Sequence, residues 1–193
     1  MKIVIIDYGA GNIQSIKFAL ERLGYSAVLS DDPKIIKAAD KVIFPGVGEA
    51  SSAMKKLREH RLENLIAELT QPVLGICLGM QLMCNYSEEG NTRGLGIFDV
   101  DVVKFTDELK VPQIGWNQIR ELKTPLFRDI PENGFIYLVH SYYAPLCGET
   151  IAVTDYGIPY SSAVQKDNFW GVQFHPEKSS TLGERILKNF ITL

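Results

Sequence analysis

The chain has 193 residues, of which 46% are hydrophobic and 22% are charged, and its formal net charge is −3. This composition is typical of one globular domain with a substantial buried core. The acidic charge and the lack of a Lys/Arg cluster argue against a nucleic-acid partner, and no apolar run reaches the length that spans a membrane.

The start of the chain and its cysteines bear on the cellular compartment. Met1 and Lys2 lead directly into an apolar segment without the pattern of a signal peptide, so we expect a cytoplasmic protein. The three cysteines show no C-x-x-C spacing. An odd, scattered set of this kind argues against a disulfide framework and against a structural zinc site.

Strand and helix patterns alternate in the first half of the chain. Apolar runs predict strands over 2–7, 25–29, 41–44 and 72–76, and helical spacing predicts helices over 16–23, 34–39 and 51–69. This order predicts an α/β fold, in which a mixed, mostly parallel sheet has helices on both faces. Because ligands bind at the carboxyl ends of such strands, Gly9, Gly46 and Cys77 should gather at one functional edge.

Shorter alternating segments follow in the second half. The patterns at 99–105, 115–119, 135–140, 151–154, 163–166 and 170–174 predict antiparallel or mixed strands that extend the sheet. Residues 181–191 predict a closing amphipathic helix. Because we find no internal repeat and no linker, we expect a single domain over 1–193.

The loop after the first strand invites a reading as a dinucleotide-binding fingerprint. Its sequence, Gly-Ala-Gly-Asn-Ile-Gln at 9–14, places Gln14 where the third glycine of that fingerprint is needed for close helix packing. The sequence therefore does not support a nucleotide site at this loop.

Cys77 stands in Gly-Ile-Cys-Leu-Gly at 75–79, between a predicted strand and a predicted helix. A nucleophile flanked in this way by small residues is typical of a nucleophile elbow. The helix predicted to begin at Leu78 would point free backbone N–H groups at the sulfur and offer donors to an oxyanion. In isolation the residue could equally be a small buried hydrophobe, as most free cysteines are.

His175 and Glu177 lie far downstream, in Phe-Trp-Gly-Val-Gln-Phe-His-Pro-Glu at 169–177. The alternation predicts a strand that ends near Pro176 and places His175 and Glu177 on one face. A carboxylate there can accept a hydrogen bond from the imidazole and fix its tautomer. A lone pair of this kind is usually solvated, but together with Cys77 it completes the groups that thiol-based acyl transfer needs.

The segments at 75–81 and 171–177, together with Pro-Gly-Val-Gly at 45–48, resemble the signatures of the class I (triad) glutamine amidotransferases. The resemblance implies a flavodoxin-like fold and a glutaminase with the triad Cys77, His175 and Glu177, which needs no metal or redox cofactor. It also implies an oxyanion hole from the backbone N–H groups of Val47 and Leu78. The residues it implies for glutamine binding are Gly46, Gly48, Gln81, Glu89, Ser141 and Tyr142.

Three further segments, at 7–13, 114–117 and 137–142, resemble one branch of this family. Members of that branch are the glutaminase subunits of a synthase in histidine biosynthesis. The resemblance implies L-glutamine as the substrate and a heterodimer with a cyclase subunit that has a (β/α)8 barrel and uses the ammonia. The residues it places at the partner interface are Asn12, Trp116, Asn117, Tyr137 and Lys178.

Several residues carry less specific signals. On a strand, Lys178 would point opposite to Glu177 toward a neighbouring surface, although a lone lysine is more often simply solvated. Cys84 should lie two turns beyond Cys77 on the same helix and be inert, as should Cys147. His140 belongs to the segment at 137–142 without being the catalytic base.

Two other functions stay open at this point. One is a glutaminase subunit of another enzyme, such as pyridoxal phosphate synthase, in which a Gly-Gly-Glu-Ser segment typically stands where this chain has Pro-Gly-Val-Gly at 45–48. The other is a noncatalytic binding module on the same fold, since a fold does not determine a function. The complete set of Cys77, His175 and Glu177 disfavours the second alternative.

Overall fold

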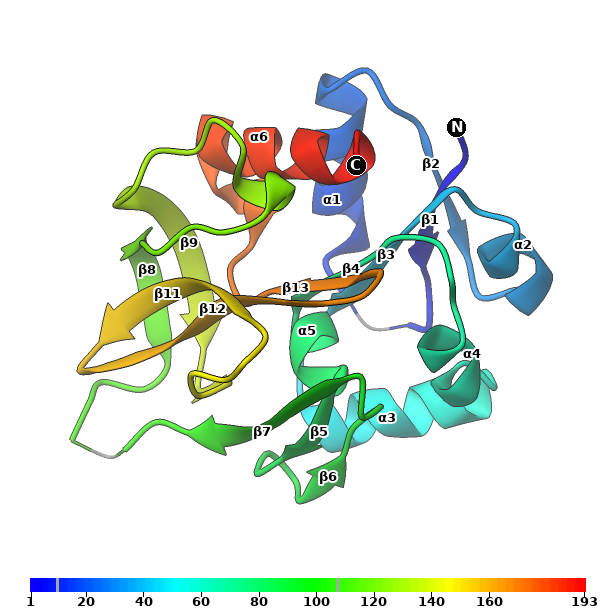
Figure 1. Ribbon diagram of the computed structural model, residues 1–193. Coiled ribbons are helices and arrows are strands. Elements are labelled where there is room, and N and C mark those ends of the chain that lie inside the picture. The colour runs from blue at the N-terminus through cyan, green and yellow to red at the C-terminus, as the bar shows by residue number, and fades with distance from the viewer. Residues whose placement is uncertain (10, 107) are drawn as a thin grey trace.

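The computed structural model describes residues 1–9, 11–106 and 108–193 (Figure 1). Within this part of the chain, a seven-stranded sheet runs in the order β11-β12-β13-β4-β3-β1-β2. The strands of the sheet are β1 (Ile3–Ile6), β2 (Ala27–Ser30), β3 (Lys41–Gly46), β4 (Val73–Cys77), β11 (Thr150–Tyr156), β12 (Ile158–Lys166) and β13 (Phe169–Val172). The first four and β13 pair in parallel, while β12 pairs antiparallel with both β11 and β13, which confirms the mixed, mostly parallel sheet.

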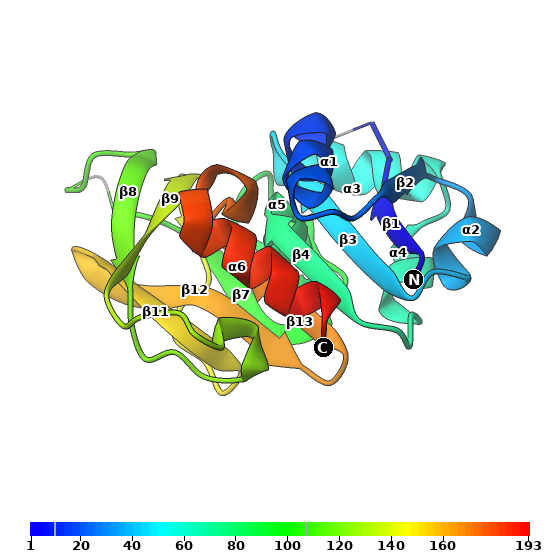
Figure 2. The same ribbon diagram turned by 90° about the horizontal axis from the view of Figure 1, so that it is seen from above.

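Helices cover both faces of this sheet. They are α1 (Ile13–Arg22), α2 (Pro33–Lys37), α3 (Ala50–Glu59), α4 (Glu63–Ala67), α5 (Leu78–Leu82) and α6 (Ser180–Ile191). Alternate residues of β1 point to opposite sides, so that Ile3 and Ile5 join the core beneath α1 and α6, and Val4 and Ile6 join the core beneath α2 to α5. Figure 2 shows α1 and α6 on the same side of the sheet. Burial on both faces explains why the first strands are continuous apolar runs.

The segment 51–69, predicted to be mostly helical, forms two helices. α3 ends at Glu59, and Arg61 adopts a positive φ of 59° before α4 begins at Glu63. A left-handed residue cannot continue a right-handed helix. The predicted cap of α2 is confirmed, since the Asp32 carboxylate accepts a hydrogen bond from the backbone N–H of Lys34 at 2.8 Å.

The prediction that all later strands extend the sheet holds only for β11, β12 and β13. A second sheet has the order β10-β7-β5-β6, built from β5 (Cys84–Ser87), β6 (Thr92–Arg93), β7 (Phe98–Lys104) and β10 (Tyr142–Tyr143). An antiparallel pair consists of β8 (Gln113–Ile119) and β9 (Gly134–His140). Alternating strands such as β7, with Asp99 and Asp101 exposed, keep one face in water and therefore do not fit a sheet covered on both sides.

The predicted place of Cys84 on the helix after Cys77 is also wrong. α5 ends at Leu82, and Cys84 begins β5. The carbonyl groups of Leu82, Met83 and Cys84 accept hydrogen bonds from backbone N–H groups of residues 95–98. Because these carbonyls are used by a neighbouring segment, they cannot continue the helical ladder.

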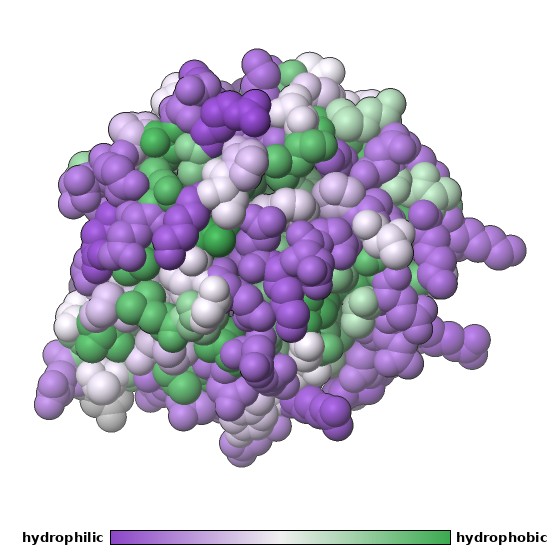
Figure 3. Space-filling view, in the orientation of Figure 1, coloured by the Kyte–Doolittle hydropathy of each residue, from purple (hydrophilic) through white to green (hydrophobic). Residues whose placement is uncertain are grey.

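The remaining elements are two 3-10 helices, η1 (Pro125–Phe127) and η2 (Pro176–Lys178), among the residues that the structure covers. Hydrophobic side chains on the face seen in Figure 3 lie in separate patches among hydrophilic ones. In the described ranges, no helix is both long enough and apolar enough to cross a membrane.

Gly79 allows α5 to lie directly against β3. A Cβ atom at this position would overlap the carbonyl oxygen of Phe44, and one at Gly46 would lie 2.7 Å from the backbone nitrogen of Gly79. We therefore expect Gly79→Ala to lower the free energy of unfolding by about 1–3 kcal/mol, because two backbone segments must separate. Urea unfolding measures this change.

The matched control is Gly148→Ala, since nothing lies within 4 Å of a Cβ atom there. It should unfold at the urea concentration of the unmodified chain. Equal midpoints for Gly79→Ala and Gly148→Ala would contradict the close approach of α5 and β3.

Candidate active site

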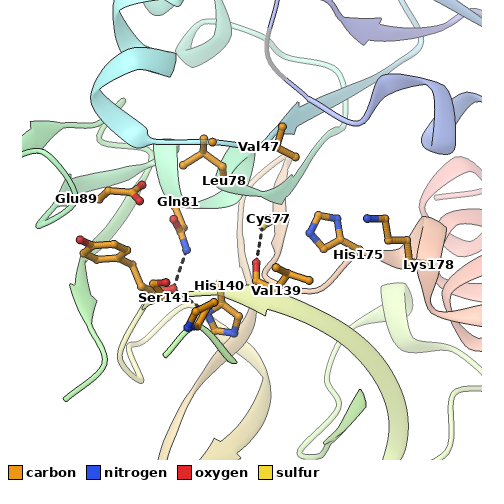
Figure 4. A pocket seen from close by; sticks show the side chains of 13 residues that line it. Val47, Cys77, Leu78, Gln81, Glu89, Val139, His140, Ser141, His175 and Lys178 are labelled. Carbon is orange, nitrogen blue, oxygen red and sulfur yellow. Dashed lines mark hydrogen bonds between the residues drawn. The ribbon is translucent and has the colours of Figure 1, made fainter. Parts of the chain in front are cut away.

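A cavity of about 350 Å³ lies where β3 and β4 end and the chain from β9 to β10 passes. Figure 4 shows Gln81 and Glu89 on one side of Cys77, and His175 and Lys178 on the other. The cavity is lined by Val47, Gly48, Cys77, Leu78, Gln81, Glu89, Pro112, Val139, His140, Ser141, Tyr142, His175 and Lys178. The cavity therefore lies at the carboxyl edge of the parallel strands, the edge at which ligands of such sheets bind.

Cys77 has the backbone of an elbow. It ends β4, precedes the first residue of α5 and adopts φ 53° and ψ −111°, a conformation that is strained for any residue except glycine. The flanking glycines let the helix turn back closely: a Cβ atom at Gly75 would lie 2.9 Å from the backbone nitrogen of Met80. Cys77 is only 7% exposed, and it reaches solvent through the cavity.

His175 and Glu177 contact each other, but not along a strand. β13 ends at Val172, and Pro176 begins the 3-10 helix η2, which turns Glu177 back toward the imidazole. The Nδ1 atom of His175 lies 2.8 Å from Oε1 of Glu177, whose side chain is fully buried. The predicted strand exists as β13 but does not continue to His175, because the backbone N–H of His175 donates to Tyr137 in β9 instead of continuing the ladder of the main sheet.

The protonation of His175 depends on its two neighbours. Burial lowers the pKa of His175, but hydrogen bonds with the side chains of Cys77 and Glu177, and the charges of these groups, outweigh burial and raise the pKa to about 10. The imidazole is therefore held in its charged form beside the sulfur. A protonated imidazole in this place stabilises negative charge on the Cys77 sulfur and can later donate its proton.

His140 has the opposite environment, although it also lines the cavity. Burial is the main cause that lowers the pKa of His140 to about 4; the charge of His175 adds to this, and the hydrogen bond to Tyr142 opposes it. Its Nδ1–H donates to the carbonyl oxygen of Tyr142 at 2.8 Å, and its Nε2 lies 3.2 Å from the hydroxyl of Tyr160. A neutral imidazole with both nitrogens engaged packs the cavity wall, so of the two histidines His175 is the one placed to transfer a proton beside the sulfur.

Gln81 belongs to a buried chain of amides that ends at the sulfur. Its Nε2 donates to the carbonyl oxygen of Tyr142 at 2.8 Å and to Oε1 of Gln173 at 2.9 Å, and Nε2 of Gln173 lies 3.8 Å from Sγ of Cys77. Because Tyr142 offers a backbone carbonyl, Gln81 must turn its nitrogen toward it. The amide oxygen of Gln81 is then the atom that can accept a hydrogen bond from a ligand.

Glu89 is fixed at the far end of the cavity. Its Oε2 accepts a hydrogen bond from the backbone N–H of Ala50 at the start of α3, at 2.9 Å. Burial raises the pKa of Glu89, partly offset by this hydrogen bond. Glu89 therefore belongs to the cavity rather than to a fully solvated loop.

The other predicted site residues take three kinds of position. Gly46 and Glu177 stand behind the cavity wall, against α5 and His175 respectively. Lys178 lies on η2 rather than on a strand, and its exposed side chain lines the cavity next to His175 instead of pointing away from it. The residues predicted for the partner interface, Asn12, Trp116, Asn117 and Tyr137, are outside the cavity lining.

The residues predicted for the partner interface differ in their local contacts. Trp116 is 52% exposed and packs edge-on against Tyr137, with ring centroids 5.9 Å apart. Asn117 uses its amide within the chain, because Nδ2 donates to the carbonyl oxygen of Asp155 at 2.9 Å. Asn12 accepts a hydrogen bond from Ser15 at the start of α1, while Ala10 in the same loop lies outside the described residues.

Sequence reasoning did not single out Gln173, Val139 or Pro112. Gln173 is fully buried, and its signal was a polar side chain on the His175 side of an otherwise apolar segment. Val139 and Pro112 are apolar and reach the cavity only through the packing of β8 and β9. Nothing in their local sequence distinguishes such wall residues from other apolar positions.

An elbow cysteine, an imidazole and a buried carboxylate at the carboxyl edge of a mostly parallel sheet form the arrangement that thiol-based acyl transfer uses. The family model described as "Glutamine amidotransferase class-I" matches residues 4–193. The chain belongs to this family.

Relatives and solved structures agree with this membership. Over 196 aligned residues that cover both chains completely, the sequence is 57% identical to "Imidazole glycerol phosphate synthase subunit HisH" of Bacteroides fragilis. It is 50% identical, with the same coverage, to the protein of that name from Yersinia pseudotuberculosis. A crystal structure of a glutamine amidotransferase matches with a TM-score of 0.76 at 20% identity, covering 98% of this chain and 97% of the other, which supports the fold.

Proposed function

We propose that the chain is the glutaminase subunit of imidazole glycerol phosphate synthase. It hydrolyses L-glutamine to glutamate and supplies ammonia to a cyclase subunit in histidine biosynthesis. The observation that carries this proposal is full-length identity of 57% to a subunit of that synthase. Support comes from the cavity, which Cys77 and His175 line, and from Glu177 behind its wall, whose Oε1 lies 2.8 Å from Nδ1 of His175.

The chemistry follows from the positions of these groups. The Cys77 thiolate attacks the carboxamide carbon of glutamine, and the backbone N–H groups of Val47 and Leu78 hold the oxyanion of the tetrahedral intermediate. His175 protonates the leaving nitrogen, so that ammonia departs and a thioester remains. His175 then takes a proton from water, which attacks the thioester and releases glutamate and the free thiol.

Substrate recognition involves the polar side of the cavity. Gln81 presents its amide oxygen and Glu89 a carboxylate, and both can accept hydrogen bonds from the α-ammonium group of glutamine. Ser141 and Tyr142 line the same wall. Gly46 and Gly48 flank Val47 and let its peptide turn toward the ligand; Gly48 has a φ of +94°.

A partner subunit is proposed to cover the exposed face of β8 and β9. Ile114 and Trp116 are 63% and 52% exposed, and they pair across the strands with Val139 and Tyr137. Phe135, two residues before Tyr137, is 53% exposed. Since Val139 also lines the cavity, a partner on this apolar face would lie next to the place where ammonia forms. We propose a cyclase with a (β/α)8 barrel as this partner, in a heterodimer.

The experiment that tests this proposal mixes the chain with the cyclase subunit and its nucleotide ligand. We expect a low glutaminase rate for the isolated chain and strong stimulation in the mixture.

Trp116→Ala should weaken association with the cyclase by roughly tenfold or more, because a large exposed aromatic is removed from the proposed interface. Lys178→Ala should raise the glutamate formed per imidazole product. Titration calorimetry and paired product assays measure the two effects.

Val28→Ala is the control, since Val28 is 46% exposed on β2, at the opposite edge of the main sheet from β11. It should associate normally. If the cyclase failed to stimulate the unmodified chain, the proposed synthase role would be wrong. If Trp116→Ala associated as tightly as Val28→Ala, the proposed interface would be wrong.

A further inference from the structure

Tyr8 is a buried residue whose hydroxyl has a specific acceptor. It lies two residues beyond the end of β1, is 0% exposed, and donates its hydroxyl proton to the carbonyl oxygen of Pro45 at 3.0 Å. Its ring packs against Phe44, with centroids 5.7 Å apart. The hydrogen bond therefore joins the loop after β1 to the last part of β3.

Pro45 opens the segment Pro-Gly-Val-Gly at 45–48, in which Pro45 and Gly46 pair with Ile76 and Cys77 of β4, whereas Val47 and Gly48 lie beyond the end of β3. Gly46 and Gly48 have no side chains, and the Val47 side chain is 41% exposed, so none of the three is anchored by a side chain packed in the core. Downstream, the Glu49 side chain caps α3 by accepting a hydrogen bond from the backbone N–H of Ser52 at 3.0 Å. The upstream end is held by the pairing of β3 with β4 and by the hydrogen bond from Tyr8 to Pro45.

Gly11, in the same loop as Tyr8, also lies close to Pro45. Gly11 has a φ of +140°, and a Cβ atom there would lie 3.2 Å from Cβ of Pro45. Burial raises the pKa of the Tyr8 hydroxyl, and the charge of Cys77 raises it further. The hydroxyl consequently stays protonated and remains a donor close to the nucleophile.

We infer that Tyr8 is a positioning residue for the oxyanion hole: its hydroxyl holds the Pro45 carbonyl so that the following peptide can aim the Val47 N–H at the substrate oxygen. This role rests on the proposed function, in which Val47 is an oxyanion donor. A donor whose direction is fixed stabilises charge that develops in the transition state, and it adds little to the binding of neutral carboxamide in the ground state.

Tyr8→Phe tests this role, because it removes one hydroxyl and keeps the ring against Phe44. In the complex with the cyclase we expect kcat for glutamine hydrolysis to fall by roughly 10-fold to 100-fold, with KM within about twofold. The rate of alkylation of Cys77 by iodoacetamide should stay unchanged in the full chain. Alkylation needs the thiolate but develops no oxyanion, so it separates the oxyanion hole from the nucleophile.

Tyr156→Phe is the matched control, since the Tyr156 hydroxyl also donates to a backbone carbonyl, that of Lys110, at 2.7 Å. It should keep kcat and KM, and urea unfolding of both variants reports any general loss of stability. An unchanged kcat in Tyr8→Phe would overturn the inference, and so would an equal loss of kcat and alkylation rate. The proposed function is tested separately by whether the unmodified complex hydrolyses glutamine.

Discussion

Cys77→Ala should abolish glutamine hydrolysis by the complex and leave its ammonia-dependent synthesis intact. Removing the nucleophile prevents formation of the thioester, so we expect kcat for glutamine to fall on the order of 10⁴-fold or more. Added ammonia bypasses this step, because in the proposed complex the cyclase needs ammonia and not the thiol. Measuring both reactions on one preparation distinguishes loss of the nucleophile from loss of the fold.

The other two cysteines provide the controls for this prediction. Cys84 is fully buried, burial raises the pKa of its thiol, and its Sγ lies 3.6 Å from the carbonyl oxygen of Met80. Cys147 is half-buried beside Thr150. A diazo-ketone analogue of glutamine should label Cys77 and spare both of these residues. Normal glutaminase activity in Cys77→Ala, or labelling of Cys147 in place of Cys77, would contradict the assignment of the nucleophile.

The parallel half of the fold could be predicted from local sequence because its strands are covered on both faces. Each of β1, β3 and β4 is buried throughout, so each appears as an uninterrupted apolar run between helical patterns. The later strands are different. Alternation predicts that β7, β8 and β9 are strands, but which partner each one pairs with depends on distant segments, such as β5 for β7.

The site shows the same division between local and long-range information. The elbow is local, since Gly75, Cys77 and Gly79 are close in sequence and a small residue is needed on each side of the nucleophile. The contact of His175 with Glu177 was expected for the wrong backbone reason, because a 3-10 helix and not a strand forms it. The hydrogen bond of Tyr8 to Pro45 joins residues 37 positions apart and left no pattern in the sequence.

The second large expected effect is a loss of kcat on replacing His175, which His140 should not show. His175→Ala should lower kcat for glutamine hydrolysis by on the order of 100-fold or more, because it removes the group that we propose protonates the leaving nitrogen and activates water. His140→Ala should act mainly through KM and stability, since burial keeps His140 neutral and both of its nitrogens are engaged in the cavity wall. Steady-state kinetics of the complex with the cyclase separates kcat from KM.

Glu177→Gln sharpens this distinction because it keeps the shape of the side chain. Glu177 is one of the two groups that raise the pKa of His175, so its neutral replacement lowers that pKa, and the imidazole loses its proton at a lower pH. The alkaline limb of the pH profile should therefore shift to lower pH, with a kcat between those of the unmodified chain and His175→Ala. A profile that kept its alkaline limb, or equal losses of kcat in Glu177→Gln, His175→Ala and His140→Ala, would be incompatible with a carboxylate that acts through His175. The buried contact of 2.8 Å between Glu177 and His175 would then serve the fold alone.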